Sequence, residues 1–462
     1  MARGKKAAKE LSPEEKLQQA LVPVEEQPYP IPENWCWVRL GSLLNEIKNG
    51  TTIKQDKSSS GYWVTRIESL QNQTIDFNRL GSIVNKCDIK DTDWYMAGDI
   101  ALSHINSADH VGKTALINAD MLPLVHGMNL LRLRFNENCI PAFFQYYSQS
   151  FQYKEEILSR INMAVNQVSI NQKQLGSLEF PLPTLPEQHR IISRIESLFA
   201  KLDEAKEKAQ AVVDSFELRK SVILHKAFAG ELTEWWRKDH GVGLDSWKIM
   251  SLNDCIQKMQ NGLAKRSGSI GESYVVLRLA NLSENGFDTS DLREILLDEK
   301  EQEAYSLLEN DVIMIRVNGS KDNVGRQLLV PDVKKWAFCD HIIRIRYRNN
   351  VLPDYMVLFS KSDNYRTYVK NHMVSSAGQN TISRKGIANM AVPVPECDEQ
   401  KEIVRTLSVL FNKEQQAKEA AETVLAQIDT IKKAILARAF RGELGTNDPA
   451  EEWAGELVKA VL

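Results

Sequence analysis

Two short stretches of the sequence resemble fragments of a phosphate-binding loop. Residues 111–114 read VGKT and residues 324–327 read VGRQ. Such a loop needs a glycine five positions before the glycine that precedes its lysine, and in the first stretch that position is Ser107. The second stretch has Arg326 and Gln327 in place of the lysine and the hydroxyl residue. We therefore do not expect either stretch to bind a nucleotide.

Other catalytic patterns are also incomplete. Pro353-Asp354 followed by Glu399-Gln400-Lys401 resembles the PD…ExK motif of nucleases, but the related triplet Glu187-Gln188-His189 lacks the lysine. The sequence has no Asn- or Asp-Pro-Pro-aromatic tetrapeptide, no glycine-rich cofactor loop and no HExxH. Its eight histidines do not cluster, and its six cysteines lack zinc-ligand spacing. The sequence thus predicts no catalytic residue, no metal site and no cofactor bound by this chain.

Three polar loops, each present in two versions, offer chemistry of another kind. Residues 49–61 and 261–271 are glycine- and serine-rich and carry cations suited to phosphates. Residues 103–113 and 315–326 each follow a strand and carry Asn with His, Lys or Arg, while residues 165–173 and 375–385 are rich in amides and hydroxyls. Asn, Arg and Lys hydrogen-bond to purine edges in the major groove. The loops therefore predict a DNA-binding surface in each copy.

The candidate DNA-binding residues come from these loops and from one arginine in an apolar strand of each copy. In the first copy they are Lys54, Lys57, Arg66, His104, Asn106, His110, Lys113, Asn166 and Gln167. In the second copy they are Lys265, Arg266, Arg278, Arg316, Asn318, Lys321, Asn323, Arg326, Gln379 and Asn380. Ordinary solvated turns explain any single loop equally well, and the two strand arginines (VTRIESL and VLRLANL) fit structural ion pairs equally well.

The segments that position these loops occur twice in the sequence. Residues from about 40 to 232 recur at about 252 to 444, displaced by a nearly constant 212 positions. This period is too long for a solenoid, so it indicates two whole domains. Strand-like segments such as residues 130–135 and 342–347 alternate with helical segments such as 142–158 and 355–373. This pattern is typical of an α+β domain.

A Pro-x-Pro segment ends each domain, and a long helix follows each one. Residues 186–228 carry apolar or alanine side chains at alternating steps of four and three, as in a coiled coil. The second long helix should end before Gly442, and Glu414 interrupts its apolar seam. We expect the two helices to pair with each other. If they form an antiparallel coiled coil, the domains are related by a pseudo-twofold axis.

The resulting division of the chain has six parts. They are a flexible leader at 1–30, a first recognition domain at 31–183, a central helix at 184–233, a second recognition domain at 245–395, a C-terminal helix at 396–444 and a tail at 445–462.

Composition limits the class of protein to which the chain can belong. The 462 residues are 43% hydrophobic and 26% charged, with a net charge of −3 and no apolar run of membrane-spanning length. The basic N-terminus lacks the apolar core of a signal peptide. The cysteines are interpreted as reduced thiols, which favours a cytoplasmic protein. The near-neutral charge argues against a strong non-specific grip on DNA unless partners share the phosphate contacts.

Together, the tandem domains, the Pro-x-Pro exits followed by Glu-Gln, and the helices ending AFAGEL and AFRGEL resemble the specificity subunit of type I restriction–modification systems. The resemblance covers about residues 32–445. It implies a non-catalytic chain whose two target recognition domains each read half of a bipartite site on double-stranded DNA. The helices would pair antiparallel, set the spacer and dock two methyltransferase subunits, with restriction–translocase subunits beyond.

The resemblance also assigns the cofactors: S-adenosylmethionine, ATP and Mg would belong to those partner subunits. Two features depart from it, the basic leader and Glu414. Because the loops differ between the two copies, the recognised site should be asymmetric. Three alternatives remain: a self-contained DNA methyltransferase or nuclease, a coiled-coil adaptor without sequence specificity, and a DNA-reading subunit of a methylation-only or other non-type-I system.

Overall fold

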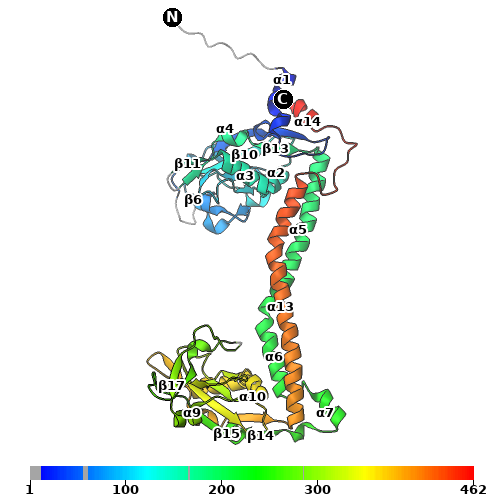
Figure 1. Ribbon diagram of the computed structural model, residues 1–462. Coiled ribbons are helices and arrows are strands. Elements are labelled where there is room, and N and C mark those ends of the chain that lie inside the picture. Colours follow the sequence, from blue (N-terminus) through cyan, green and yellow to red (C-terminus); the bar gives the residue numbers. More distant parts are fainter. Residues whose placement is uncertain (1–11, 56–60, 165–166, 285, 462) are drawn as a thin grey trace. The chain divides into compact units, whose positions relative to one another are not determined.

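The computed structural model describes residues 12–55, 61–164, 167–284 and 286–461. The chain forms two compact units. The first comprises the residues up to Ala209 together with those from Thr423 onward, and the second comprises Gln210–Glu422. Each unit therefore holds one recognition domain and a part of each long helix (Figure 1).

The core of each unit is a four-stranded antiparallel sheet with the same strand order. In the first unit the order is β2 (Leu44–Asn49), β10 (Leu130–Phe135), β7 (Ile100–Ser103) and β9 (Thr114–Leu116). In the second it is β15 (Ile256–Asn261), β22 (Ile342–Tyr347), β18 (Val312–Ile315) and β20 (Gln327–Leu329). The central strands β10 and β22 coincide with the predicted segments 130–135 and 342–347.

Smaller sheets accompany each core, and two of them have counterparts in both units. A two-stranded sheet joins the entry and exit of each domain: β1 (Cys36–Arg39) with β13 (Glu179–Leu182), and β14 (Lys248–Ser251) with β25 (Ala391–Val394). A three-stranded sheet has the order β11 (Asn162–Ala164), β12 (Gln167–Ser169) and β8 (Ile105–Asn106) in the first unit. Its counterpart has the order β23 (Val374–Ser376), β24 (Gln379–Thr381) and β19 (Val317–Asn318).

Each predicted domain helix is in fact two helices. Segment 142–158 folds as α2 (Pro141–Tyr147) and α3 (Phe151–Arg160), and segment 355–373 as α10 (Pro353–Phe359) and α11 (Asp363–His372). Serine causes the break in both units, because the Ser150 hydroxyl accepts a hydrogen bond from the Tyr153 N–H at 3.2 Å and Ser362 accepts one from Tyr365 at 3.4 Å. A side chain that caps the orphan N–H groups starts a new helix at that point.

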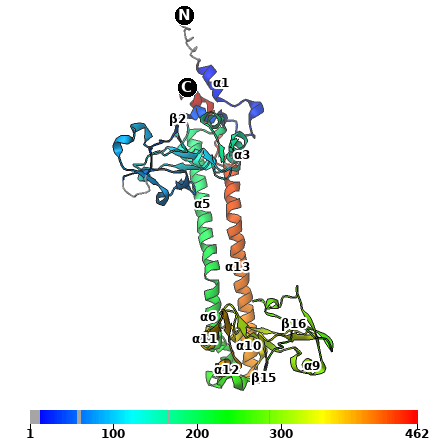
Figure 2. The same cartoon turned by 90° about the vertical axis from the view of Figure 1, so that its left-hand side faces the viewer.

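The long helices pair antiparallel, as the resemblance implies. The first is α5 (Leu185–Asp214) continued by α6 (Phe216–Phe228), and the second is α13 (Cys397–Ala439). Within the first unit, Asp203 of α5 accepts from the Lys432 ammonium of α13 at 2.6 Å. Within the second unit, α6 lies beside α13 in both views (Figures 1 and 2), and Arg219 bonds to Glu414 at 2.7 Å.

The Arg219–Glu414 pair explains the break in the apolar seam. Ser215 lies between α5 and α6, and the Arg219 guanidinium donates to its hydroxyl and, at 3.2 Å, to the Val212 carbonyl. The polar residue that interrupts the seam of α13 is therefore matched by an arginine at the interruption of the partner helix. Predicted as one helix, residues 186–228 are instead two.

Residues 12–30, expected to be a flexible leader, contain helix α1 (Pro13–Ala20). Ala20 is buried, and Leu21 bridges to Val38 of β1. Helix α14 (Gly455–Val461) of the expected tail lies beside α1 in the first unit (Figures 1 and 2). Among the described residues, no helix combines the length and apolar character needed to cross a membrane.

Candidate nucleic-acid interface

The three-stranded sheets bring the second and third polar loops together in each unit. In the first unit Asn106 of β8 faces Val168 of β12, and in the second Asn318 of β19 faces Asn380 of β24. The loops that the sequence separates by about 60 residues thus form one surface, and the same surface recurs in both units.

Local hydrogen bonds shape the loop between β8 and β9 in the first unit. The Asn106 amide donates to Ser103 Oγ at 3.2 Å, and its carbonyl oxygen accepts from the Ser107 N–H at 2.9 Å. His110 Nδ1 lies 2.9 Å from Ser107 Oγ. These bonds tie the Asn106 and His110 side chains to neighbouring residues of the same loop.

The remaining candidates of the first unit are mostly on the surface. Lys54, Lys113 and Gln167 are exposed. Lys57 and Asn166 lie outside the described residues.

His104 borders an open cavity beside this sheet. The cavity has a volume of about 580 Å³ and is lined by Asn49, His104, Ile105, Leu131, Ser169, Ile170, Asn171, Gln172 and Lys173. Burial lowers the pKa of the His104 imidazole, an effect opposed by a hydrogen bond to the backbone of Asn129. The imidazole is therefore neutral at neutral pH.

In the second unit the amides are tied more closely into the loop. Asn318 Oδ1 accepts from the Ser320 N–H at 2.9 Å and from Asn323 Nδ2 at 3.4 Å. Asn380 is only 6% exposed and donates to the Gly319 carbonyl at 2.8 Å. Its amide therefore supports the loop from within. Lys321 and Gln379 are exposed and Arg326 is half-buried.

In the second unit, the cations of the first polar loop already form ion pairs. Lys265 donates to Glu301 at 2.7 Å. Arg266 lies 3.5 Å from the Asp340 carboxylate, and Arg316 of the second loop donates to the Asp340 carbonyl at 3.1 Å. Asp340 thus links the first and second loops of this unit.

The two strand arginines form ion pairs. Arg66 lies 3.0 Å from Glu68, and Arg278 lies 2.9 Å from Asp291. Of the two interpretations that the sequence left open, ion pairing is the one that this geometry supports. Both arginines remain about a third exposed.

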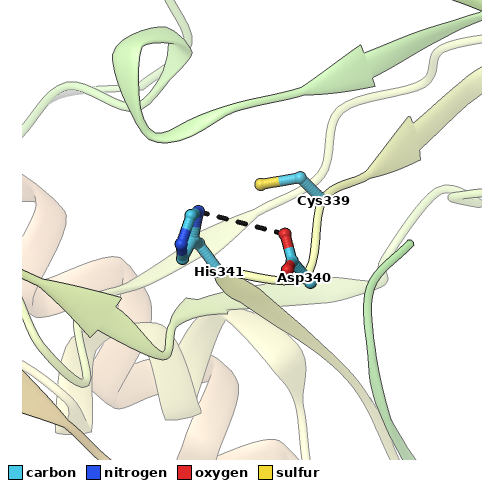
Figure 3. A group of neighbouring side chains, drawn as sticks. All are labelled: Cys339, Asp340 and His341. Carbon is cyan, nitrogen blue, oxygen red and sulfur yellow. Dashed lines mark ion pairs between the residues drawn. The ribbon is translucent and has the colours of Figure 1, made fainter. Parts of the chain in front are cut away.

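Asp340 also belongs to the group Cys339, Asp340 and His341, whose potential ligand atoms lie within 4.8 Å of one another (Figure 3). Arg266 lies 3.5 Å from the same carboxylate, and burial raises the pKa of the Cys339 thiol. A nearby guanidinium and a protonated thiol both oppose a divalent cation. We therefore interpret the group as part of a turn in which Asp340 contacts both loops.

The Glu-Gln pairs at the start of the long helices are functional residues whose role the sequence alone did not indicate. Gln188 accepts from the Ile140 N–H at 2.8 Å and donates to the Asn138 carbonyl at 2.9 Å. Gln400 makes the equivalent bonds to Leu352 and Asn350 at 2.8 and 2.9 Å. Each glutamine therefore fixes the start of a long helix to its own domain.

The neighbouring glutamates bind the segment that follows the other long helix. Glu187 accepts from Thr446 Oγ1 at 2.7 Å. Glu399 accepts from Thr233 Oγ1 at 2.7 Å, from Arg237 at 2.6 Å and from the Trp247 indole at 2.8 Å. The recurrence of Glu-Gln after 212 positions was the sequence signal for both attachments.

Comparison with known proteins identifies this architecture. The family described as "Type I restriction modification DNA specificity domain" matches residues 32–213 and again residues 245–423. The chain belongs to this family. It is a specificity subunit of a type I restriction–modification system, as the resemblance implied, and each match covers one recognition domain with most of its long helix.

Relatives and solved structures agree over nearly the whole chain. The StySPI specificity subunit of Salmonella potsdam is 29% identical, with 91% of each chain covered. The putative MjaX specificity subunit of Methanocaldococcus jannaschii is 30% identical over 90% of this chain and 94% of its own length. The HsdS subunit from Thermoanaerobacter tengcongensis has the same fold, with a TM-score of 0.62 at 18% identity over 91% of this chain and all of its own.

Proposed function

We propose that each three-stranded sheet, with the loops beside it, reads one half of a bipartite, asymmetric site on double-stranded DNA. The supporting observation is that the two units share a sheet of the same strand order but differ in the side chains that it carries. His104 corresponds to Arg316, and Met163 of β11 corresponds to Ser375 of β23. One scaffold with different polar side chains suits two different base sequences.

The chain's part in the reaction is recognition. Methyl transfer, translocation and cleavage, with S-adenosylmethionine, ATP and Mg, would reside in two methyltransferase subunits and in restriction–translocase subunits. The modest charge of the chain fits this division, because its partners would supply many phosphate contacts.

The long helices offer surfaces for such partners. Leu218 and Val222 are 68% and 45% exposed and lie one turn apart on α6. Val424 and Ile431, each 40% exposed, are seven residues apart on α13 and share a face. We assign these apolar faces to methyltransferase docking, and the length of the paired helices to the length of the DNA spacer.

Methylome sequencing of cells that express the chain with its methyltransferase subunits tests this proposal. We expect one methylated motif made of two different half-sites separated by a fixed spacer. No methylated motif, despite an assembled complex, would favour an adaptor without sequence specificity. Methyl transfer by the purified chain alone would instead make it an enzyme.

A further inference from the structure

His104, which lines the cavity beside the three-stranded sheet, has a hydrogen-bonding atom without a partner in the described part of the chain. Among the described residues, His104 Nδ1 is buried and has no hydrogen-bond partner. A buried polar atom of this kind costs free energy unless a ligand satisfies it. The cavity wall next to it combines amides, a hydroxyl and Lys173 with three aliphatic side chains, and it contains no carboxylate.

The chemistry of the ring determines what Nδ1 can bind. The ring hydrogen-bonds to the backbone of Asn129, and this bond favours the protonated ring. The ring is therefore the donor, and its Nδ1 atom is left without a partner. A neutral imidazole carries one proton, so Nδ1 is a hydrogen-bond acceptor. Its partner must be a donor.

The equivalent position of the second unit has the opposite chemistry. Arg316 donates through Nη1 to the Asp340 carbonyl at 3.1 Å. A guanidinium has five N–H donors and no acceptor, so further donors remain. Asn261, which corresponds to Asn49 of the cavity wall, also has a buried Oδ1 without a partner within the described residues. Among the described residues, each unit thus has a buried polar atom without a partner, on His104 in the first unit and on Asn261 in the second.

We propose that this position selects one base in each half-site: His104 Nδ1 accepts from the exocyclic amino group of an adenine or cytosine, and Arg316 donates to a guanine. In the major groove only adenine N6 and cytosine N4 offer donors, whereas guanine O6 and N7 are the acceptors that arginine binds with two hydrogen bonds. The inference rests on the proposed function and adds the base class that each unit reads.

The surroundings fit a base edge of DNA rather than a cationic or purely apolar ligand. Residues 161–173 and 373–385, which contain β11–β12 and β23–β24, include no Asp or Glu and end in Lys173 and Lys385. A chain with 61 acidic residues in 462 thus keeps both segments free of negative charge. These lysines suit the phosphates that flank the base.

Exchange of the two side chains tests the inference in the reconstituted complex. The assay measures methyl transfer to duplex libraries that are randomised within each half-site. His104→Arg should change one position of the first half-site from adenine or cytosine to guanine, with a preference of about 5- to 150-fold. Arg316→His should make the reverse change in the second half-site only. His240→Arg is the matched control and should leave both half-sites unchanged, because His240 is exposed, lies outside the polar loops, and has its Nδ1 2.9 Å from the Trp236 carbonyl.

A second measurement does not depend on the arginine being accommodated. A duplex whose base at that position lacks the exocyclic amino group should be methylated about 5- to 150-fold more slowly by the wild type. The His104→Ala complex should already methylate the normal duplex slowly, and removal of the amino group should not slow its methyl transfer further. The inference would be overturned if the His104→Arg complex were active but recognised an unchanged motif. It would also be overturned if removal of the amino group slowed methyl transfer equally in the wild type and in His104→Ala. A wild-type complex without any bipartite motif would instead overturn the proposed function.

Discussion

Replacing Glu399 by glutamine should destabilise the second unit strongly. Glu399 is 1% exposed, and its carboxylate accepts hydrogen bonds from Thr233, Arg237 and Trp247 at 2.6–2.8 Å. Arg237 is itself only 6% exposed. Glutamine keeps the volume but removes the charge, so the guanidinium remains buried without its counterion.

Removing one partner of a buried ion pair costs about 3–5 kcal/mol. For a domain of about 150–250 residues, each kcal/mol lowers the unfolding temperature by roughly 2–4 °C. The transition of the second unit should therefore fall by about 6–20 °C. Calorimetry on the full chain measures this shift directly.

Two control variants isolate the buried pair. Asp398→Asn removes the adjacent carboxylate, which is 78% exposed and pairs with Lys401 at 2.9 Å, and should leave the transition unchanged. The double variant Glu399→Gln/Arg237→Met should recover part of the loss, because it contains no unpaired charge. A Glu399→Gln shift as small as that of Asp398→Asn, or strictly additive losses in the double variant, would refute this reasoning.

Three further predictions concern the coiled coil, the first recognition surface and pH. A double-mutant cycle with Arg219→Leu and Glu414→Leu should give a coupling of about 1 kcal/mol or less in denaturant unfolding, because the two side chains are 33% and 23% exposed. Met163, 83% exposed on β11, is suited to contact a thymine methyl, so replacing thymine by uracil in the first half-site should slow methyl transfer about fourfold. Met163→Ala should abolish that difference, and Val84→Ala, which alters an exposed apolar residue outside the sheet, should preserve it. Burial lowers the pKa of His126 from 6.5 to about 3, so the unfolded chain binds a proton that the native state excludes. The free energy of unfolding should therefore have its full value above pH 6.5 and should fall by about 2 kcal/mol by pH 5. The wild-type curve minus that of His126→Asn should show this loss, and parallel curves would contradict it.

Periodicity and proline placement predicted the larger elements because those signals are local. The alternating segments 130–135 and 342–347 are strands, and both long helices begin after the Pro-x-Pro exits. The heptad pattern also predicted that the two helices pair, and the resemblance to specificity subunits implied that they pair antiparallel. The break at Ser215 could not be predicted in the same way, because it is stabilised by Arg219, whose other partner Glu414 is distant in sequence.

The recognition surface was predictable in composition but not in geometry. The polar loops could be found from their recurrence, but two-residue strands such as β8 and β19 carry no periodic signal that fixes their pairing. Asn380 shows the consequence: its residue type suggests base contact, yet its amide is buried and bonds to Gly319. The unpartnered Nδ1 of His104 likewise depends on a cavity formed by distant segments.

In the proposed function, each unit reads its own half of the site. The most direct test is methylome sequencing with the triple variant in which Arg316, Asn318 and Lys321 become alanine. We predict that the half-site read by the second unit becomes degenerate or changes, while the other half-site and the spacer stay as in the wild type. An unchanged motif, or changes in both halves, would contradict the assignment of these loops.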